Sequence, residues 1–192
     1  MLLLDKNKLT HLPPEIYQLS GSIRKLSLTG NPIPMLNMHI YENCQNWTTK
    51  IDLSHSLVIN DSANGMTSFV LHNEIFAGLS QLKQLCLNDN EITLLPSSVS
   101  ELVSLEILEL QNNQLNVLPW QLGMLTSLKK LKLGGNPLAR IPLDVRRQKN
   151  NLPSLLHYLL SLKETTEECY RYTIALTTHT HTHTHTHTHT HT

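Results

Sequence analysis

The sequence predicts an α/β solenoid, a stack of similar coils with short parallel strands along one face and a capping helix over the last coil. One observation is a pattern of leucines with one asparagine, which returns every 23 residues from Asn90 to Asn113 and Asn136. A second is composition, because 40% of the 192 residues are hydrophobic but only 5% are aromatic. A third is the helical spacing of the leucines between Leu152 and Leu162.

The repeating unit has the template L-x-x-L-x-L-x-x-N-x-L-x-x-L-P, where x is any residue. It fits three times in succession from Leu82 onward and, with partial matches, twice near the N-terminus. The full matches start at Leu82, Leu105 and Leu128, and the N-terminal ones start at Leu2 and Ile23. A degenerate unit starts at Ile51 and has Ser56 in place of the asparagine.

Each unit is expected to form one strand and one turn. The leucines of L-x-L point inward and the x residues point outward, because side chains alternate along a strand. The asparagine amide can donate and accept hydrogen bonds with the backbone of the turn that follows. Stacked coils should place these amides in one column, a structural ladder of Asn7, Asn31, Asn90, Asn113 and Asn136. The proline after the last leucine sits where the chain leaves the sheet and needs no donor.

Two Gly-Asn-Pro sequences divide the array into two predicted blocks, residues 1–46 and 47–165. A surface insertion is expected near residues 57–75, because the spacing between Ser56 and Asn90 exceeds one repeat and the intervening sequence is rich in turn residues. Asn151 and Pro153 mark the start of a capping helix near residues 151–163.

The two ends of the chain are unusual for such an array. Met1 falls inside a predicted strand, so the array is expected to extend further upstream. Thr178 to Thr192 alternates threonine and histidine, which is what an (AC)n DNA repeat encodes. Residues 166–192 are therefore expected to be a disordered tail that arises from the gene model. The alternative interpretation is metal binding by the histidines of this tail.

Charge and motifs argue against several function classes. The 15 basic residues balance the 15 acidic ones, whereas nucleic-acid binders usually carry a basic excess. Catalytic and phosphate-binding motifs are absent, and no apolar run approaches the roughly 18 residues of a membrane span. Cys44, Cys86 and Cys169 are odd in number and widely spaced, which favours free thiols in the cytoplasm. We therefore predict neither an enzyme nor a cofactor or metal site.

The leucine and asparagine positions resemble those of the leucine-rich-repeat superfamily over most of residues 2–162. The L-P-x-x-[IVL]-x-x-L spacing is similar to that of the cytoplasmic Ras-associated scaffolds of the erbin, scribble and Ras-suppressor type. The two-block layout looks like that of the leucine-rich repeat-containing protein 40 type. This resemblance implies a horseshoe-shaped adaptor for signalling proteins, with a small GTPase or a phosphatase subunit as its partner.

The predicted functional site is the outer, concave face of the strands, the surface that curved solenoids use for binding. Its residues are the outward positions of each strand and of the turn that follows: Lys25, Ser27, Thr29, Lys50, Asp52, Ser54, Gln84, Cys86, Asn88, Ile107, Glu109, Gln111, Lys130 and Lys132. Cys86 is expected to be accessible on this face. The simpler interpretation is a solvated strand surface without function. A hypothesis from another class is that the repeats are the targeting domain of a larger enzyme.

Overall fold

The structure is a computed structural model of the chain, and it describes residues 1–10, 23–32, 48–56, 69–71, 76, 78–142 and 152–163. Several predicted features lie outside these residues: the tail over 166–192, the block boundary at residues 46 and 47, most of the insertion near 57–75, and both Cys44 and Cys169.

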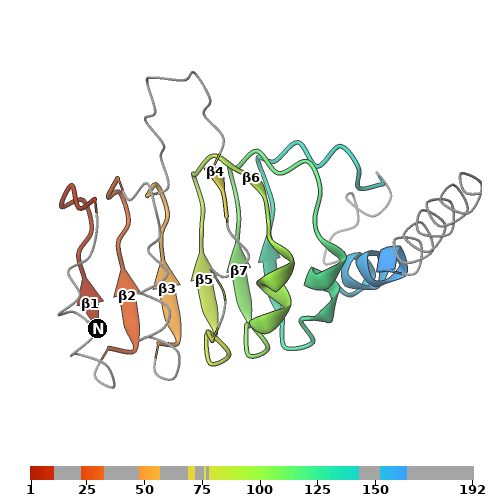
Figure 1. Cartoon of the computed structure of the whole chain (residues 1–192), viewed down its shortest axis with the longest axis horizontal. Helices are drawn as coiled ribbons and strands as arrows, with labels where there is room; N and C mark the ends of the chain where they lie inside the picture. The colour runs from red at the N-terminus through yellow and green to blue at the C-terminus, as the bar shows by residue number, and fades with distance from the viewer. Residues whose placement is uncertain are drawn as a thin grey trace, which may run out of the picture.

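Six short strands form one parallel sheet along the molecule (Figure 1). In sheet order they are β1 (Leu2–Leu3), β2 (Lys25–Ser27), β3 (Lys50–Asp52), β5 (Gln84–Cys86), β7 (Ile107–Glu109) and β8 (Lys130–Lys132). Each strand pairs with the one from the neighbouring coil, and every pair is parallel. The predicted solenoid of parallel strands is therefore confirmed.

The register of the sheet follows the leucine template. Leu26, Ile51, Leu85 and Leu108 occupy equivalent positions in successive strands. Strands β2 and β3 pair directly, so the sheet is continuous on both sides of the predicted block boundary. The division into two blocks leaves no gap in the sheet.

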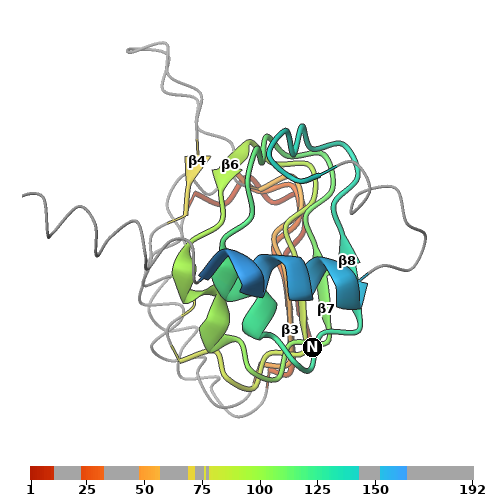
Figure 2. The same cartoon turned by 90° about the vertical axis from the view of Figure 1, so that its right-hand side faces the viewer.

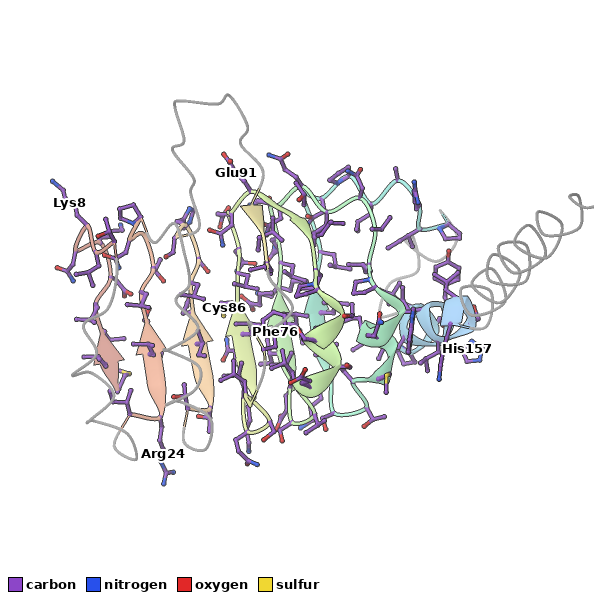
Figure 3. The ribbon with its side chains drawn as sticks, in the orientation of Figure 1. Lys8, Arg24, Phe76, Cys86, Glu91 and His157 are labelled. Atoms are coloured by element: carbon purple, nitrogen blue, oxygen red, sulfur yellow. The ribbon has the colours of Figure 1, made fainter. Side chains whose placement is uncertain are left out.

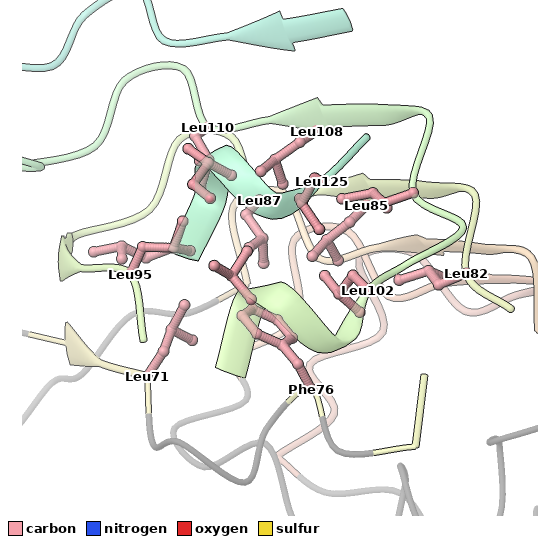
Figure 4. Packing of buried hydrophobic residues seen from close by; sticks show 14 of the residues in the cluster. Leu71, Phe76, Leu82, Leu85, Leu87, Leu95, Leu102, Leu108, Leu110 and Leu125 are labelled. Atoms are coloured by element: carbon pink, nitrogen blue, oxygen red, sulfur yellow. The ribbon is translucent and has the colours of Figure 1, made fainter. Parts of the chain in front are cut away.

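The aliphatic side chains of the template fill the interior of the coils. Leu85, Leu87, Leu108 and Leu110 are buried in one cluster that runs through the coils. Figure 4 shows these leucines in one cluster with Phe76. The inward direction predicted for the L-x-L leucines is thus what the structure shows.

Two short 3-10 helices close the side of the coils away from the sheet (Figure 2). η3 (Ser97–Glu101) and η4 (Trp120–Met124) each follow a proline, Pro96 or Pro119, in extended conformation. The missing N–H of proline costs nothing at this point, where the chain leaves the sheet. Val99 and Leu122 are fully buried, so each turn contributes an apolar side chain to the core.

A second, two-stranded parallel sheet joins β4 (Phe69–Val70) to β6 (Ile92–Leu94), with an irregular register. Strand β4 belongs to the segment in which a surface insertion was expected. Leu71 and Phe76, which follow it, are buried in the core. Leu71, which lies within that segment, is therefore part of the core and not of a surface loop.

Residues 152–163 form a helix against the last coils, as the leucine spacing predicted (Figure 2). Leu159 is only 1% exposed and belongs to the core cluster. Gly123 of η4 allows the close approach, because a Cβ atom there would lie 2.8 Å from the Leu156 carbonyl oxygen. The Lys163 ammonium lies 5.3 Å from the centre of the Trp120 ring, within the range of a cation–π contact.

The turn after each strand contains a residue in the left-handed conformation, directly before the asparagine position. These residues have φ between 54° and 76°: Lys6, Gly30, His55, Asp89, Asn112 and Gly135. Glycine adopts this conformation without steric cost, and His55, Asp89 and Asn112 are of the other types that adopt it most often, whereas Lys6 is not. Within the described residues, no helix has the length and apolar character needed to cross a membrane.

Candidate binding face on the parallel sheet

A column of asparagines holds the strand ends in place. The Asn113 amide donates to the carbonyl oxygens of Leu110 in its own coil and Leu87 in the preceding coil, at 3.0 and 2.9 Å. Its Oδ1 accepts from the Ile92 N–H at 3.1 Å. Asn136 makes the equivalent bonds to Leu133, Leu110 and Leu115. Each asparagine thus ties its coil to the one before it.

The same pattern recurs at the N-terminal side. Asn31 donates to the carbonyl oxygens of Leu4 and Leu28, and it accepts from the N–H groups of Asn7 and Leu9. Asn90 donates to Leu53 and Leu87 and accepts from the Ser56 N–H. The structure therefore places Asn31, Asn90, Asn113 and Asn136 in one column, whereas the exposed Asn7 joins it through its backbone N–H.

Ser56 replaces the asparagine in the degenerate coil and makes part of its hydrogen bonds. Its hydroxyl oxygen lies 2.7 Å from the Leu28 carbonyl oxygen, to which it donates. A hydroxyl carries one proton, whereas an amide carries two, so Ser56 satisfies fewer backbone groups. The neighbouring Asn90 satisfies the Leu53 carbonyl at the strand end.

The outward residues named from the sequence lie together on one face of the six-stranded sheet. We call this surface the sheet face, and it comprises Lys25, Ser27, Thr29, Lys50, Asp52, Ser54, Gln84, Cys86, Asn88, Ile107, Glu109, Gln111, Lys130 and Lys132. The register arranges them in rows across the strands: Lys25, Lys50, Gln84, Ile107 and Lys130 form one row. Ser27, Asp52, Cys86, Glu109 and Lys132 form the next.

Hydroxyl groups hold the carboxylate of Asp52 in the second row. Its Oδ1 accepts from the hydroxyls of Ser54 and Thr29, at 2.9 and 3.2 Å, and from the Ser54 N–H. Asp5, which follows β1 two coils earlier and which sequence reasoning did not include, accepts from the Ser27 hydroxyl and the Thr29 N–H of the next coil.

Glu109 is the centre of a second polar group on this face. Its Oε1 lies 2.6 Å from the Lys132 ammonium, and its Oε2 accepts from the Asn88 amide at 3.1 Å. Partial burial works to raise the pKa of Glu109, but the hydrogen bonds from Lys132 and Asn88 outweigh it and hold the pKa below its usual value. Asn88 also accepts from the Gln111 N–H, which links three strand ends.

Cys86 is not accessible, and the expectation that it would be was wrong. Its side chain is 3% exposed because Asp52 and Glu109 flank it in register on either side. Burial, together with these two carboxylates, raises the pKa of the Cys86 thiol to about 11. Ser27 is likewise buried within the face, at 5% exposure. These two residues support their neighbours and offer little surface to a partner.

A rim of charged residues precedes the strands. Glu106 lies between two lysines, 2.7 Å from the Lys129 ammonium and 3.9 Å from that of Lys83. The hydrogen bond from Lys129 lowers the pKa of Glu106. This rim was not predicted as part of the site, although the sequence places these residues directly before the outward positions.

The opposite ends of the strands carry a separate polar chain. His55 Nε2 lies 3.2 Å from Asp89 Oδ2, and the Asn112 amide donates to Asp89 Oδ1 at 2.7 Å. These three residues occupy the left-handed turn positions and are partly or largely exposed. In the part of the chain that the structure describes, His, Cys, Asp and Glu side chains nowhere gather in a group of three that could hold a metal ion.

The comparisons with known proteins agree with the fold. The sequence profile of the leucine rich repeat family matches residues 48–115. A leucine-rich-repeat protein of Leptospira interrogans is 32% identical with a TM-score of 0.60, and the match covers 70% of this chain and 31% of that one. The search among curated proteins found no match.

Two further solved structures show the same architecture. The leucine-rich repeat domain of the type III effector XopL is 26% identical with a TM-score of 0.51, over 69% of this chain and 43% of that one. A chain of the Drosophila Toll–Spätzle complex is 22% identical with a TM-score of 0.50, over 68% of this chain and 19% of that one. This chain therefore spans less than half the length of each of the three structures.

Proposed function

We propose that the chain is a leucine-rich-repeat protein that binds another protein through its sheet face and catalyses no reaction itself. The observation that carries the proposal is the ordered polar surface of five neighbouring strands, whose side chains are supported from below by buried leucines. A rigid scaffold that holds polar groups in fixed rows loses little conformational freedom when a partner binds.

The alternative, a merely solvated surface, accounts less well for the hydrogen bonds within the face. Asp52 and Glu109 are each held by two or more side chains from their own and neighbouring coils. Such ordering gives a partner fixed acceptors, as complementary recognition requires. A strand surface that is only solvated does not need such a network of hydrogen bonds.

The partner class follows only from the resemblance to Ras-associated scaffolds. On that basis we propose a signalling adaptor in the cytoplasm, with a small GTPase or a phosphatase subunit as its partner. The spacing of the repeats supports this assignment, and the free Cys86 thiol agrees with a reducing compartment. The Thr-His tail, the basis of the metal-binding alternative, lies outside the described residues.

Site-specific photo-crosslinking tests the face itself. A photoreactive phenylalanine analogue is placed at Gln84 or Gln111 on the sheet face, or at Gln121 of η4 as the matched control. All three are partly buried glutamines, but Gln121 lies on the other side of the coil (Figure 2). We expect crosslinks to a protein from the first two positions only. Crosslinks from Gln121 alone would contradict the proposal.

A charge exchange tests the polar groups of the face. Glu109→Lys combined with Lys132→Glu keeps an ion pair but reverses its direction across β7 and β8. Capture of the crosslinked partner should fall, while the circular dichroism spectrum stays unchanged. Glu101→Lys on η3 is the control, because it changes an exposed charge away from the face. Equal capture by the exchanged protein and the control would argue against the sheet face.

A further inference from the structure

The basic side chains of the sheet face gather at the edge where the strands begin. The strand-start rows are the two residues at this edge in five neighbouring coils: Arg24 and Lys25, Thr49 and Lys50, Lys83 and Gln84, Glu106 and Ile107, Lys129 and Lys130. Six of these residues are basic and one is acidic. Figure 3 shows Arg24 at this edge, with Lys8 and Glu91 at the opposite edge.

Most of these cations have no carboxylate partner among the described residues. Glu106 serves Lys83 and Lys129 together, whereas no described ion pair includes Arg24, Lys25, Lys50 or Lys130. In the adjoining row Glu109 is paired with Lys132 and lies in the field of Lys130, and Asp52 keeps its negative charge although two hydroxyls donate to it. The cations of the strand-start rows outnumber these carboxylates and Glu106, so the surface there is positive on balance, although the chain as a whole is neutral.

Two of the lysines are placed against each other. Lys25 of β2 lies directly opposite Lys50 of β3 in the register of the sheet. Like charges in this arrangement destabilise a sheet. The core does not need lysine here, because Leu26 and Ile51 supply the buried contacts. A local cost of this kind, without a structural gain, is expected at functional positions.

The strand-start rows also contain one apolar side chain. Ile107 lies between Gln84 and Lys130 in register and is only partly buried. An isoleucine between polar neighbours offers a partner a contact that excludes water, next to lysines that form no ion pair with the described residues. The band is thus basic at both ends and apolar at one strand between them.

We propose that the strand-start rows bind an acidic protein segment that crosses the strands, with carboxylates against Lys25, Lys50 and Lys130 and an apolar side chain against Ile107. The inference rests on the proposed function and specifies the partner chemistry. Neighbouring strands lie about 4.8 Å apart and an extended segment advances about 3.3 Å per residue. The apolar residue would therefore follow the carboxylate at Lys50 by about three residues, with the next carboxylate one or two residues later.

Nucleic acid is the other polyanion to be weighed, and the surface suits it less well. The carboxylates of Asp52 and Glu109 lie two residues along the strand from Lys50 and Ile107, roughly 7 Å away. A continuous phosphate backbone would meet these charges, whereas a narrow acidic segment can stay in the basic band. The described strand-start rows also hold no aromatic ring on which a base could stack.

Fluorescence anisotropy with three labelled peptides of about 12 residues tests the partner chemistry. One peptide has two Asp-Glu pairs around a central leucine at the spacing given above. The second has glutamine for each acid, and the third has serine for the leucine. We expect the first to bind most tightly and to weaken at least tenfold when salt rises from about 0.05 to 0.5 M, because exposed charges are screened. We expect the second to show no measurable binding.

Matched double variants test the surface. Lys50→Glu with Lys130→Glu should weaken binding of the first peptide by roughly tenfold or more, since a reversed charge repels an acidic segment. Lys6→Glu with Lys8→Glu changes the net charge equally on exposed residues outside the strand-start rows, and should have less than about a twofold effect. Lys50→Gln should raise the melting temperature and weaken binding of the first peptide. If the role of Lys50 were purely structural, its replacement would not have these two effects together.

Three outcomes would overturn the inference: no binding of the acidic peptide, equal losses in the two double variants, or tighter binding of a single-stranded DNA oligonucleotide than of the peptide. If crosslinks from Gln84 persist while the acidic peptide does not bind, the inferred partner chemistry is wrong but the proposed binding face is retained. If crosslinks from Gln84 and Gln111 are both absent, the proposed function falls with it.

Discussion

At the scale of single residues, the asparagine column shows how a buried polar side chain stabilises a solenoid. Asn113 is buried, yet its amide serves backbone groups of Leu87, Leu110 and Ile92, from its own coil and the preceding one. Leaving a buried backbone group without a hydrogen bond costs more free energy than a formed hydrogen bond contributes. The asparagine is therefore retained because the turn needs it, and not because the core favours polarity.

Replacing Asn113 by leucine tests this account. Asn113→Leu should lower the free energy of unfolding by about 2–4 kcal/mol, because several backbone groups become buried and unpaired. Urea denaturation measures the loss. Gln114→Leu, which removes an exposed amide next to it, is the control and should change stability by less than about 0.5 kcal/mol. Equal losses in the two variants would contradict the account.

Glu109 gives the stability a defined pH dependence. Because its pKa is below the usual value in the folded chain, the carboxylate stabilises the fold above its unfolded pKa, near 4.3, and this contribution is lost as pH falls through the folded pKa. Glu109→Gln should cost about 1 kcal/mol at pH 7, and the difference from the wild type should vanish in acid. Denaturation at several pH values checks this. A difference that persists at low pH would mean that packing, not charge, explains the loss.

The roles of single residues could be predicted from the sequence where the same position recurs in each coil. They could not be predicted where a residue's exposure or hydrogen bonds depend on its neighbours in adjoining strands. The asparagines and inward leucines recur in one frame, so their roles could be predicted. Cys86 was expected to be accessible because it occupies an outward position, but exposure depends on Asp52 and Glu109 in the adjoining strands. Asp5 was missed because its role depends on the Ser27 hydroxyl and the Thr29 N–H, which lie one coil away.

At the scale of elements, the helix over residues 152–163 covers the end of the core through one very close contact. Gly123 lies where any side chain would meet the Leu156 carbonyl and the Leu160 side chain. The backbone of the helix cannot yield as the end of a flexible side chain could. The position of the helix is therefore determined by the absence of a side chain in η4.

An alanine at this position should displace the helix. We expect Gly123→Ala to lower the free energy of unfolding by roughly 1–3 kcal/mol, because the added methyl group overlaps backbone atoms. The melting temperature and the fluorescence of Trp120, measured in a Trp47→Phe background, report the change, since Lys163 of the helix lies over the Trp120 ring. Gly134→Ala is the matched control, because nothing lies within 4 Å of a Cβ atom there. A larger loss in the control would contradict this packing.

Strands and cap were predictable as elements because each depends on a local period of the sequence. The pairing of β4 with β6 was not predictable, since Phe69 and Val70 form too short a run to show a period and their register with Ile92 and Leu94 is irregular. Their partner is set by the coil onto which the chain folds back. Such pairing depends on long-range packing, which a repeat template does not describe.

At the scale of the whole molecule, the sheet and the core are both continuous. Strands β2 and β3 pair in the same way as β5 and β7, although the sequence suggested two blocks. One cluster of buried residues also extends from Ile23 to Leu159. Neighbouring coils in a short repeat array stabilise each other, so none of them is independent.

A single unfolding transition is therefore expected. Far-ultraviolet circular dichroism, which reports the whole chain, and the fluorescence of Trp120 in a Trp47→Phe variant, which reports the C-terminal region, should give the same denaturant midpoint. Two separate midpoints would instead support independent blocks over residues 1–46 and 47–165. Asn31→Leu, which removes a link between coils at the N-terminal side, should lower both midpoints together.

The bond between the Ser56 N–H and Asn90 has a consequence for how such a chain can change length. It joins residues 34 apart, compared with 24 for the equivalent bond from Asn7 to Asn31. The ends of the longer segment are clamped by the same amide geometry, and each doubling of a flexible loop adds only about 0.6 kcal/mol of closure entropy. We therefore expect that foreign sequence can be inserted after Ser56 without shifting the coils on either side.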